Sequence, residues 1–130
     1  MEHSREDEIR DRLADIAGPD PGPAERALLG RLIRSYLAKT PANVDRLGEL
    51  LRGGDTATLR EHAHAMKGSA SNIGANSLAT VFAEVEQAAC QGIVGDPELT
   101  LGRIACEQAL VLEILEKLAD ADEAQVPFRS

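Results

Sequence analysis

The sequence predicts an all-α protein: an antiparallel up-down-up-down four-helix bundle with an additional short N-terminal helix. Apolar residues recur every three or four positions along most of the chain, and few segments show the strict alternation typical of strands. The chain is 43% hydrophobic but only 2% aromatic, so aliphatic side chains must fill a core of the kind that packed helices build. Proline and glycine clusters divide the 130 residues, one domain's worth of chain, into segments of helical length.

Residues 1–22 are predicted to form a short helix followed by a linker. The helix is expected over residues 5–17, where three apolar residues fall on one side. These residues are Ile9, Leu13 and Ile16. The proline- and glycine-rich stretch 18–23 interrupts regular structure, and Pro23 suits the first position of the next helix.

The bundle is predicted over residues 23–120, and its first helix is expected to end at Gly53-Gly54. The apolar positions of this helix repeat at spacings of three and four. They are Leu29, Leu32, Ile33, Tyr36, Leu37, Val44, Leu47, Leu50 and Leu51. Thr40-Pro41 interrupts the pattern and indicates either a kink or a new N-cap with proline at the first helical position.

A second helix is expected over residues 56–73, with Asp55 as its N-cap and Gly74 at its end. Asn76 or Ser77 is expected to cap the third helix. The apolar face of that helix consists of Leu78, Val81, Phe82, Val85 and Ala89.

The fourth helix begins at Asp96-Pro97-Glu98, which supplies an N-cap, a proline at the first helical position and an acid in the first turn. Its predicted inward face consists of Leu101, Ile104, Ala105, Gln108, Leu112, Leu115 and Leu118. The periodicity is lost after about residue 120, so residues 121–130 are predicted to be a flexible tail.

The most informative segment of the sequence lies on the second bundle helix, around His64. A helical wheel at 100° per residue places the apolar residues of this helix within roughly 40° of one line. These residues are Leu59, Ala63, Met66, Ala70 and Ile73. His64 falls roughly 140° from that line, and His62 falls near 60° on the other side. We therefore expect an exposed His64 and a His62 at the edge of the core.

The residues beside His64 suit a phosphoryl carrier. A neutral imidazole is a good nucleophile near pH 7, because its ordinary pKa is about 6.5. Lys67 lies one turn further along the helix and can offset charge on phosphoryl oxygens. Gly68 is unusual in a helix interior, where glycine costs about 1 kcal/mol relative to alanine, and it indicates close approach by a partner.

The residues around His64 read Ala63-His64-Ala65-Met66-Lys67-Gly68-Ser69, and they are followed by Gly74-Ala75 and then by Leu78, Val85 and Glu86. This pattern resembles the histidine phosphotransfer (HPt) domain of two-component phosphorelays. Compatible helices flank this motif from about residue 24 to residue 119. The resemblance implies a four-helix bundle that receives a phosphoryl group from a receiver-domain aspartate, or passes it back. It also implies that the chain has no kinase activity of its own. By motif position, His64 is the phosphorylated residue, Lys67 its charge partner and Gly68 the access residue.

A residue on the next helix is expected to contact the imidazole. His64 lies ten residues before Gly74 and Glu86 lies eleven after Ala75, so the two side chains should stand at similar heights on adjacent helices. A carboxylate that accepts a hydrogen bond from Nδ1–H would leave Nε2 as the nucleophile. Gln87 takes this place if the turn is wound differently.

The remaining exposed residues near His64 form a predicted partner surface: Arg60, Ser71 and Gln87. The resemblance implies that the partners are receiver domains of a hybrid histidine kinase, of a response regulator, or of both. It also places Mg²⁺ in the receiver, and we expect no cofactor on this chain. The alternative is a helical adaptor that binds a receiver or kinase domain without being phosphorylated, although such an adaptor would not need a nucleophile at His64.

Composition and motifs exclude several other functions. A formal net charge of −8 argues against nucleic acid as a partner, since phosphate-backbone binding needs a concentrated basic surface. The charged N-terminus contains no signal or membrane-spanning segment. His62 and His64 point to different helix faces, so we expect no metal site, and no nucleotide-binding glycine loop is present. Cys90 and Cys106 are expected to be reduced thiols. We expect a cytoplasmic monomer, whether free-standing or part of a hybrid kinase.

Overall fold

The computed structural model describes the backbone of residues 4–125 and the side chains of residues 4–119. Over this range the chain forms five helices and no strand. They are α1 (Arg5–Ala17), α2 (Pro23–Gly53), α3 (Thr56–Asn72), α4 (Asn76–Cys90) and α5 (Pro97–Gln125). The predicted all-α class is therefore correct for the described residues.

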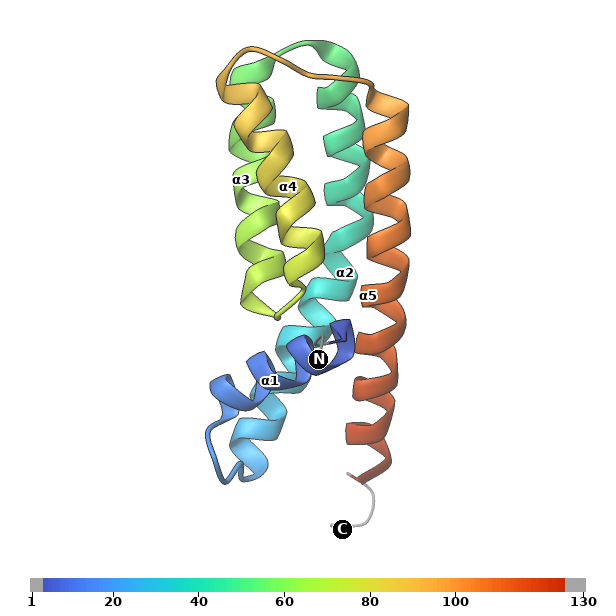
Figure 1. Ribbon diagram of the computed structural model, residues 1–130. Helices are drawn as coiled ribbons and strands as arrows, with labels where there is room; N and C mark the ends of the chain where they lie inside the picture. The colour runs from blue at the N-terminus through green and yellow to red at the C-terminus, as the bar shows by residue number, and fades with distance from the viewer. Residues whose placement is uncertain (1–3, 126–130) are drawn as a thin grey trace.

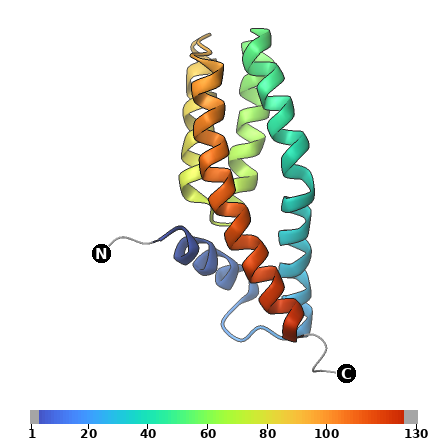
Figure 2. The same cartoon turned by 90° about the vertical axis from the view of Figure 1, so that its right-hand side faces the viewer.

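The four long helices lie side by side, and successive helices run in alternating directions (Figures 1 and 2). The most extensive helix contact is between α3 and α4, which a tight turn joins into a hairpin. α5 packs mainly on α2 and α4, and α2 also contacts α3. α1 lies below the α3–α4 turn, beside the parts of α2 and α5 that extend past that turn (Figures 1 and 2).

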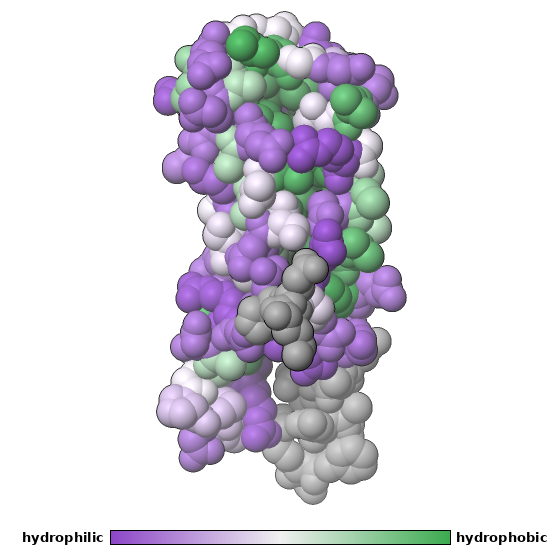
Figure 3. Space-filling model, in the orientation of Figure 1, coloured by the Kyte–Doolittle hydropathy of each residue, from purple (hydrophilic) through white to green (hydrophobic). Residues whose placement is uncertain are grey.

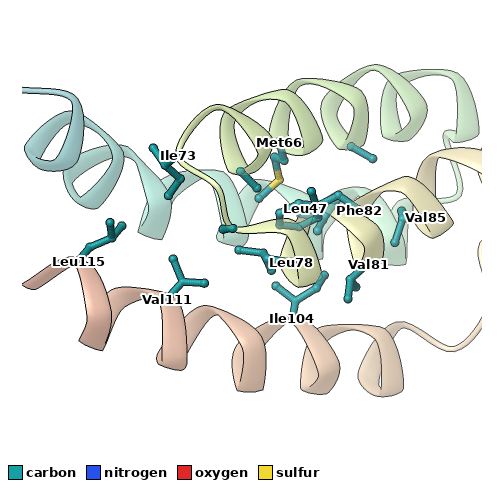
Figure 4. Close-up of a cluster of buried hydrophobic side chains, with 14 of the residues drawn as sticks. Leu47, Met66, Ile73, Leu78, Val81, Phe82, Val85, Ile104, Val111 and Leu115 are labelled. Carbon is teal, nitrogen blue, oxygen red and sulfur yellow. The ribbon is translucent and has the colours of Figure 1, made fainter. Parts of the chain in front are cut away.

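Aliphatic side chains fill the centre of the bundle, as the composition predicts (Figure 4), whereas hydrophilic residues cover most of the face shown in Figure 3. Leu47, Leu59, Leu78, Ile104 and Leu115 have no exposed surface, and the single buried aromatic residue among the described side chains is Phe82. Burying each large aliphatic side chain contributes about 1.5–3 kcal/mol relative to its exposed state. This core holds α3 and α4 in one fixed register, on which the geometry around His64 depends.

Most helix starts agree with the predictions. The carboxylate of Asp55 accepts a hydrogen bond from the Thr58 amide at 3.1 Å, and the carboxylate of Asp96 accepts one from the Glu98 amide at 3.0 Å. Pro23 and Pro97 are the first residues of their helices. These groups satisfy amides that have no partner within the helix.

The predicted cap of α4 is wrong. Neither Asn76 nor Ser77 is the N-cap, because α4 begins at Asn76 and Ala75 precedes it. Gly74 has a φ of +83°, and the Ala75 amide donates to the Ala70 carbonyl at 2.9 Å, a bond that closes the end of α3. This Schellman-type turn uses Ala75 and leaves no separate capping residue between the helices.

α2 is one helix that continues through Pro41. The proline has no N–H to donate to the carbonyl four residues earlier. One residue before it, the hydroxyl of the buried Thr40 donates to the Tyr36 carbonyl at 2.6 Å. The sequence left open a kink or a new N-cap at this point, and the structure excludes the new N-cap.

α5 differs from its prediction in two respects. Val111 is buried in place of Leu112, and Ala105, which was expected to face inward, is exposed. The helix also continues to Gln125, so the backbone of residues 121–125 is helical where a flexible tail was predicted. Strong helix formers such as alanine and glutamate extend a helix without apolar periodicity. The rest of the predicted tail, residues 126–130, lies outside the described residues.

α1 packs directly against the bundle through both apolar and polar contacts. Ile9 is fully buried, and the Arg12 guanidinium donates from Nε to the Asn72 carbonyl at 3.0 Å. A Cβ atom at Gly74 would lie 2.6 Å from the Glu8 carbonyl oxygen. Gly74 is therefore required both for its positive φ and for the close approach of α1.

Candidate functional site

α3 presents His64 to solvent and buries the opposite face. The buried residues of this helix are Leu59, Ala63, Met66 and Ala70, as the wheel predicts. The His64 side chain is 67% exposed, whereas His62 is half-buried. Nε2 of His62 lies 2.9 Å from the Asn43 carbonyl oxygen. A carbonyl only accepts, so Nε2 of His62 carries a proton and ties α3 to α2.

Glu86 on α4 binds both His64 and Lys67. Its Oε2 lies 2.8 Å from His64 Nδ1, and its Oε1 lies 2.6 Å from Lys67 Nζ. A carboxylate only accepts hydrogen bonds, so Nδ1 carries a proton, and in the neutral imidazole the lone pair is therefore on Nε2. Of the two alternatives on α4, the structure places Glu86 against the imidazole and leaves Gln87 exposed.

The contact between His64 and Glu86 follows from the hairpin geometry. The Gly74-Ala75 turn joins α3 to α4 directly, so residues at equal distances from the turn stand level on the two helices. Sequence reasoning did not predict the ion pair between Lys67 and Glu86. The signal was present, because Lys67 lies one helical turn from His64 on the side of α3 that faces α4.

The environment keeps Glu86 ionised. The hydrogen bond from Lys67, and to a smaller extent the one from His64, hold the pKa of Glu86 below its usual value, while partial burial opposes them. At neutral pH, Glu86 is therefore a carboxylate. Its hydrogen bond to Nδ1 is charge-assisted, and such bonds are stronger than those between neutral groups.

Gly68 lies one turn beyond His64 and is exposed. A Cβ atom built on Gly68 would have no neighbouring atom within 4 Å. Nothing within the described part of the chain therefore requires a glycine at this position, although glycine weakens the helix by about 1 kcal/mol relative to alanine. The space that it leaves is open to a partner.

The other predicted surface residues are exposed on the same two helices. Arg60 and Ser71 lie on α3, and Gln87 lies on α4. The structure shows no hydrogen bond or ion pair from their side chains to His64, Lys67 or Glu86, all of which lie within the described residues. These three residues can contact a partner without disturbing the cluster of His64, Lys67 and Glu86.

Two further kinds of feature are absent from the described residues. No group of three or more histidine, cysteine, aspartate or glutamate side chains among them is arranged to hold a metal ion. No helix there is long and apolar enough to cross a membrane. Cys90 and Cys106 are both exposed and form no disulfide.

A family model described as the Hpt domain matches residues 31–124, more than half of the chain. The chain belongs to the Hpt domain family. Hpt domains carry phosphoryl groups in two-component phosphorelays and are not kinases themselves. The match begins inside α2, so α1 and the linker precede it. No curated protein and no solved structure matches the chain.

Proposed function

We propose that this Hpt domain relays a phosphoryl group between receiver-domain aspartates, or from a histidine kinase, through phosphorylated His64. The observation that carries this proposal is the exposed imidazole whose Nδ1 is held by Glu86 at 2.8 Å. We further propose that α2 to α5 form an antiparallel up-down-up-down four-helix bundle, to which α1 is an additional helix. The chain is a carrier and does not itself use ATP.

The transfer step follows from the tautomer. The Nε2 lone pair of His64 attacks phosphorus, an N–P bond forms, and the bond from phosphorus to the aspartate oxygen breaks. The electron pair leaves with that oxygen as the aspartate carboxylate. Nδ1 retains its proton throughout, and the positive charge that develops on the ring faces the Glu86 carboxylate. The reverse step returns the phosphoryl group to an aspartate.

In this scheme Lys67 pairs with Glu86 before transfer and with both Glu86 and the phosphoryl group after it. In the unmodified protein its ammonium pairs with Glu86 at 2.6 Å and is one-third exposed. A phosphoryl group on Nε2 of His64 brings about two negative charges near the same ammonium. Lys67 then interacts with both groups, which stabilises the phosphorylated state. It assists the reaction as a point charge and does not perform the attack.

The partner is proposed to be a receiver domain that docks over Gly68, in contact with Arg60, Ser71 and Gln87. Mg²⁺ belongs to the acidic pocket of that receiver, where it offsets charge on the transferring group. We further propose that the chain acts as a cytoplasmic monomer and that neither nucleic acid nor a membrane is among its partners. The formal net charge of −8 supports the exclusion of nucleic acid.

The test is incubation with a phosphorylated receiver domain, followed by assay for acid-labile, base-stable phosphate on this chain. His64→Gln is expected to abolish labelling without altering the melting temperature, because the side chain is exposed. His62→Gln is the matched control, and it should retain labelling. A wild-type protein that binds the receiver but is never labelled would instead be an adaptor that acts without phosphorylation.

A further inference from the structure

A cavity lies between α1, the beginning of α2 and the C-terminal part of α5. It has a volume of about 670 Å³, is partly open to solvent, and is lined by α1, the 18–22 linker, the first turns of α2 and the C-terminal part of α5. These segments lie together in both ribbon views (Figures 1 and 2). The cavity contains none of the residues assigned to phosphoryl transfer. Its volume falls within the range of about 300–1,000 Å³ that is typical of small-molecule sites.

The walls of the cavity are largely apolar. Leu13 comes from α1, Leu29 and Ile33 from α2, and Leu118 from α5. Ala14 lies on the α1 side of the cavity. An apolar ligand would therefore contact three helices at once and would join α1 to the bundle.

The charged residues that line the cavity are Arg10, Arg34 and Asp15. Arg10 already pairs with Glu6 at 2.8 Å. The Arg34 guanidinium lies over Gly30, one turn earlier on α2. A Cβ atom built at Gly30 would be only 3.1 Å from a terminal nitrogen of this guanidinium. The absence of a side chain at position 30 thus lets a guanidinium rest against the cavity wall.

The charge of this region differs from that of the whole chain. Because Arg10 is paired with Glu6, the charges that remain on the lining are those of Arg34 and Asp15, which balance each other, whereas the chain has a formal net charge of −8. A single anionic group can bind Arg34 through charge-assisted hydrogen bonds. Asp15 disfavours a ligand that carries a second anionic group.

We propose that this cavity binds a small amphiphile with an apolar body and one carboxylate, and that the carboxylate pairs with Arg34. The family match begins at residue 31, so α1, the linker and the first residues of α2 lie before the matched region. The proposed site is thus built between this N-terminal segment and the bundle. It gives the protein a ligand site separate from phosphoryl transfer.

Decanoate, below its micelle concentration, is the probe for the full chain, with binding followed by calorimetry and by the melting temperature. We expect one bound decanoate per chain and a melting temperature that rises with its concentration, because the ligand binds the folded state. Decyltrimethylammonium has the same chain length and the opposite charge. The net charge of −8 favours this cation in general, so tighter binding of decanoate requires a local positive site.

Two pairs of variants locate the binding. Arg34→Gln is expected to weaken decanoate binding about tenfold, the effect of losing one charged hydrogen bond. Arg31 is an exposed arginine on the same helix and does not line the cavity, so Arg31→Gln is expected to bind decanoate like the wild type. Ala14→Phe should fill the cavity and abolish binding, whereas Ala27→Phe, at an exposed position outside the lining, should not.

Several outcomes would overturn this proposal. Decanoate could bind no more tightly than decyltrimethylammonium, or several decanoate molecules could bind equivalently to one chain. Each variant and its control could also lose decanoate affinity equally. Binding only after removal of residues 126–130 would also overturn it, because the complete chain would then have no open site. His64→Gln should bind decanoate normally, so a failure of the phosphotransfer proposal leaves this test intact.

Discussion

Replacing Gly68 by glutamine should stabilise the protein and impair its function at the same time. Gly68 lies inside α3, is exposed, and has open space within 4 Å of the position of a Cβ atom. A glutamine there loses no packing and removes the conformational freedom of glycine. The expected gain in the free energy of unfolding is about 0.5–1 kcal/mol, which corresponds to a rise of roughly 2–5 °C in the melting temperature.

The same side chain should obstruct the partner. A glutamine one turn from His64 projects into the space that a receiver loop would need, so transfer from a phosphorylated receiver should fall at least about tenfold. Thermal unfolding followed by circular dichroism measures the stability, and the rate of phosphate loss from the receiver measures the transfer.

Gly102 offers a matched control for this substitution. It also lies inside a helix, is exposed, and has no atom within 4 Å of a built Cβ position. It lies on α5, which packs mainly on α2 and α4 (Figure 1). Gly102→Gln should therefore raise stability by a similar amount and leave transfer unchanged. Transfer at the wild-type rate in Gly68→Gln would refute the argument that close approach explains this glycine.

Three further predictions follow from other contacts. Glu86→Ala should slow transfer about tenfold in the receiver assay, because it removes the charged acceptor on Nδ1; an unchanged rate would exclude a positioning role. Gln108→Met should raise the free energy of unfolding in urea by about 1 kcal/mol, since Nε2 of this buried side chain has no hydrogen-bond partner and the bond that its Oε1 accepts from the Tyr36 hydroxyl is long, at 3.4 Å; a clear loss of stability would contradict this. Hydrogen bonds from Arg5 lower the pKa of Glu107 in the folded protein. The pair therefore stabilises the folded state fully at pH values above the ordinary glutamate pKa of about 4.3. This stabilisation is lost as the pH falls through the lowered pKa of Glu107. The difference in unfolding free energy between wild type and Arg5→Gln should accordingly shrink from about pH 6 to about pH 3; a constant difference would show that the contact is not electrostatic.

Much of the site follows from local rules in the sequence. The 100° helical step was sufficient to predict that His64 is exposed and that His62 is half-buried. The Gly74-Ala75 turn predicted that either Glu86 or Gln87 stands level with the imidazole, and the structure has Glu86 there. Both predictions depend only on regular helix geometry and on a short connection, in which little conformational freedom remains.

Other features depend on contacts that local rules do not determine. The ion pair between Lys67 and Glu86 requires the actual rotation of α4 against α3. The choice of Val111 rather than Leu112 for the core depends on how α5 rotates about its axis, which spacing alone does not determine. The N-cap at Ala75 was missed because a glycine turn replaced the side-chain cap.

The central claim is that Glu86 fixes the proton on Nδ1 of His64 and so directs the phosphoryl group to Nε2. Nuclear magnetic resonance of the protein with ¹⁵N-labelled histidine, recorded before and after phosphorylation by a receiver, tests this claim directly. We expect an Nδ1–H tautomer at His64 before the reaction and phosphorus coupling to Nε2 of the same residue after it. Phosphorus coupling to Nδ1 of His64, or to any nitrogen of His62, would contradict it.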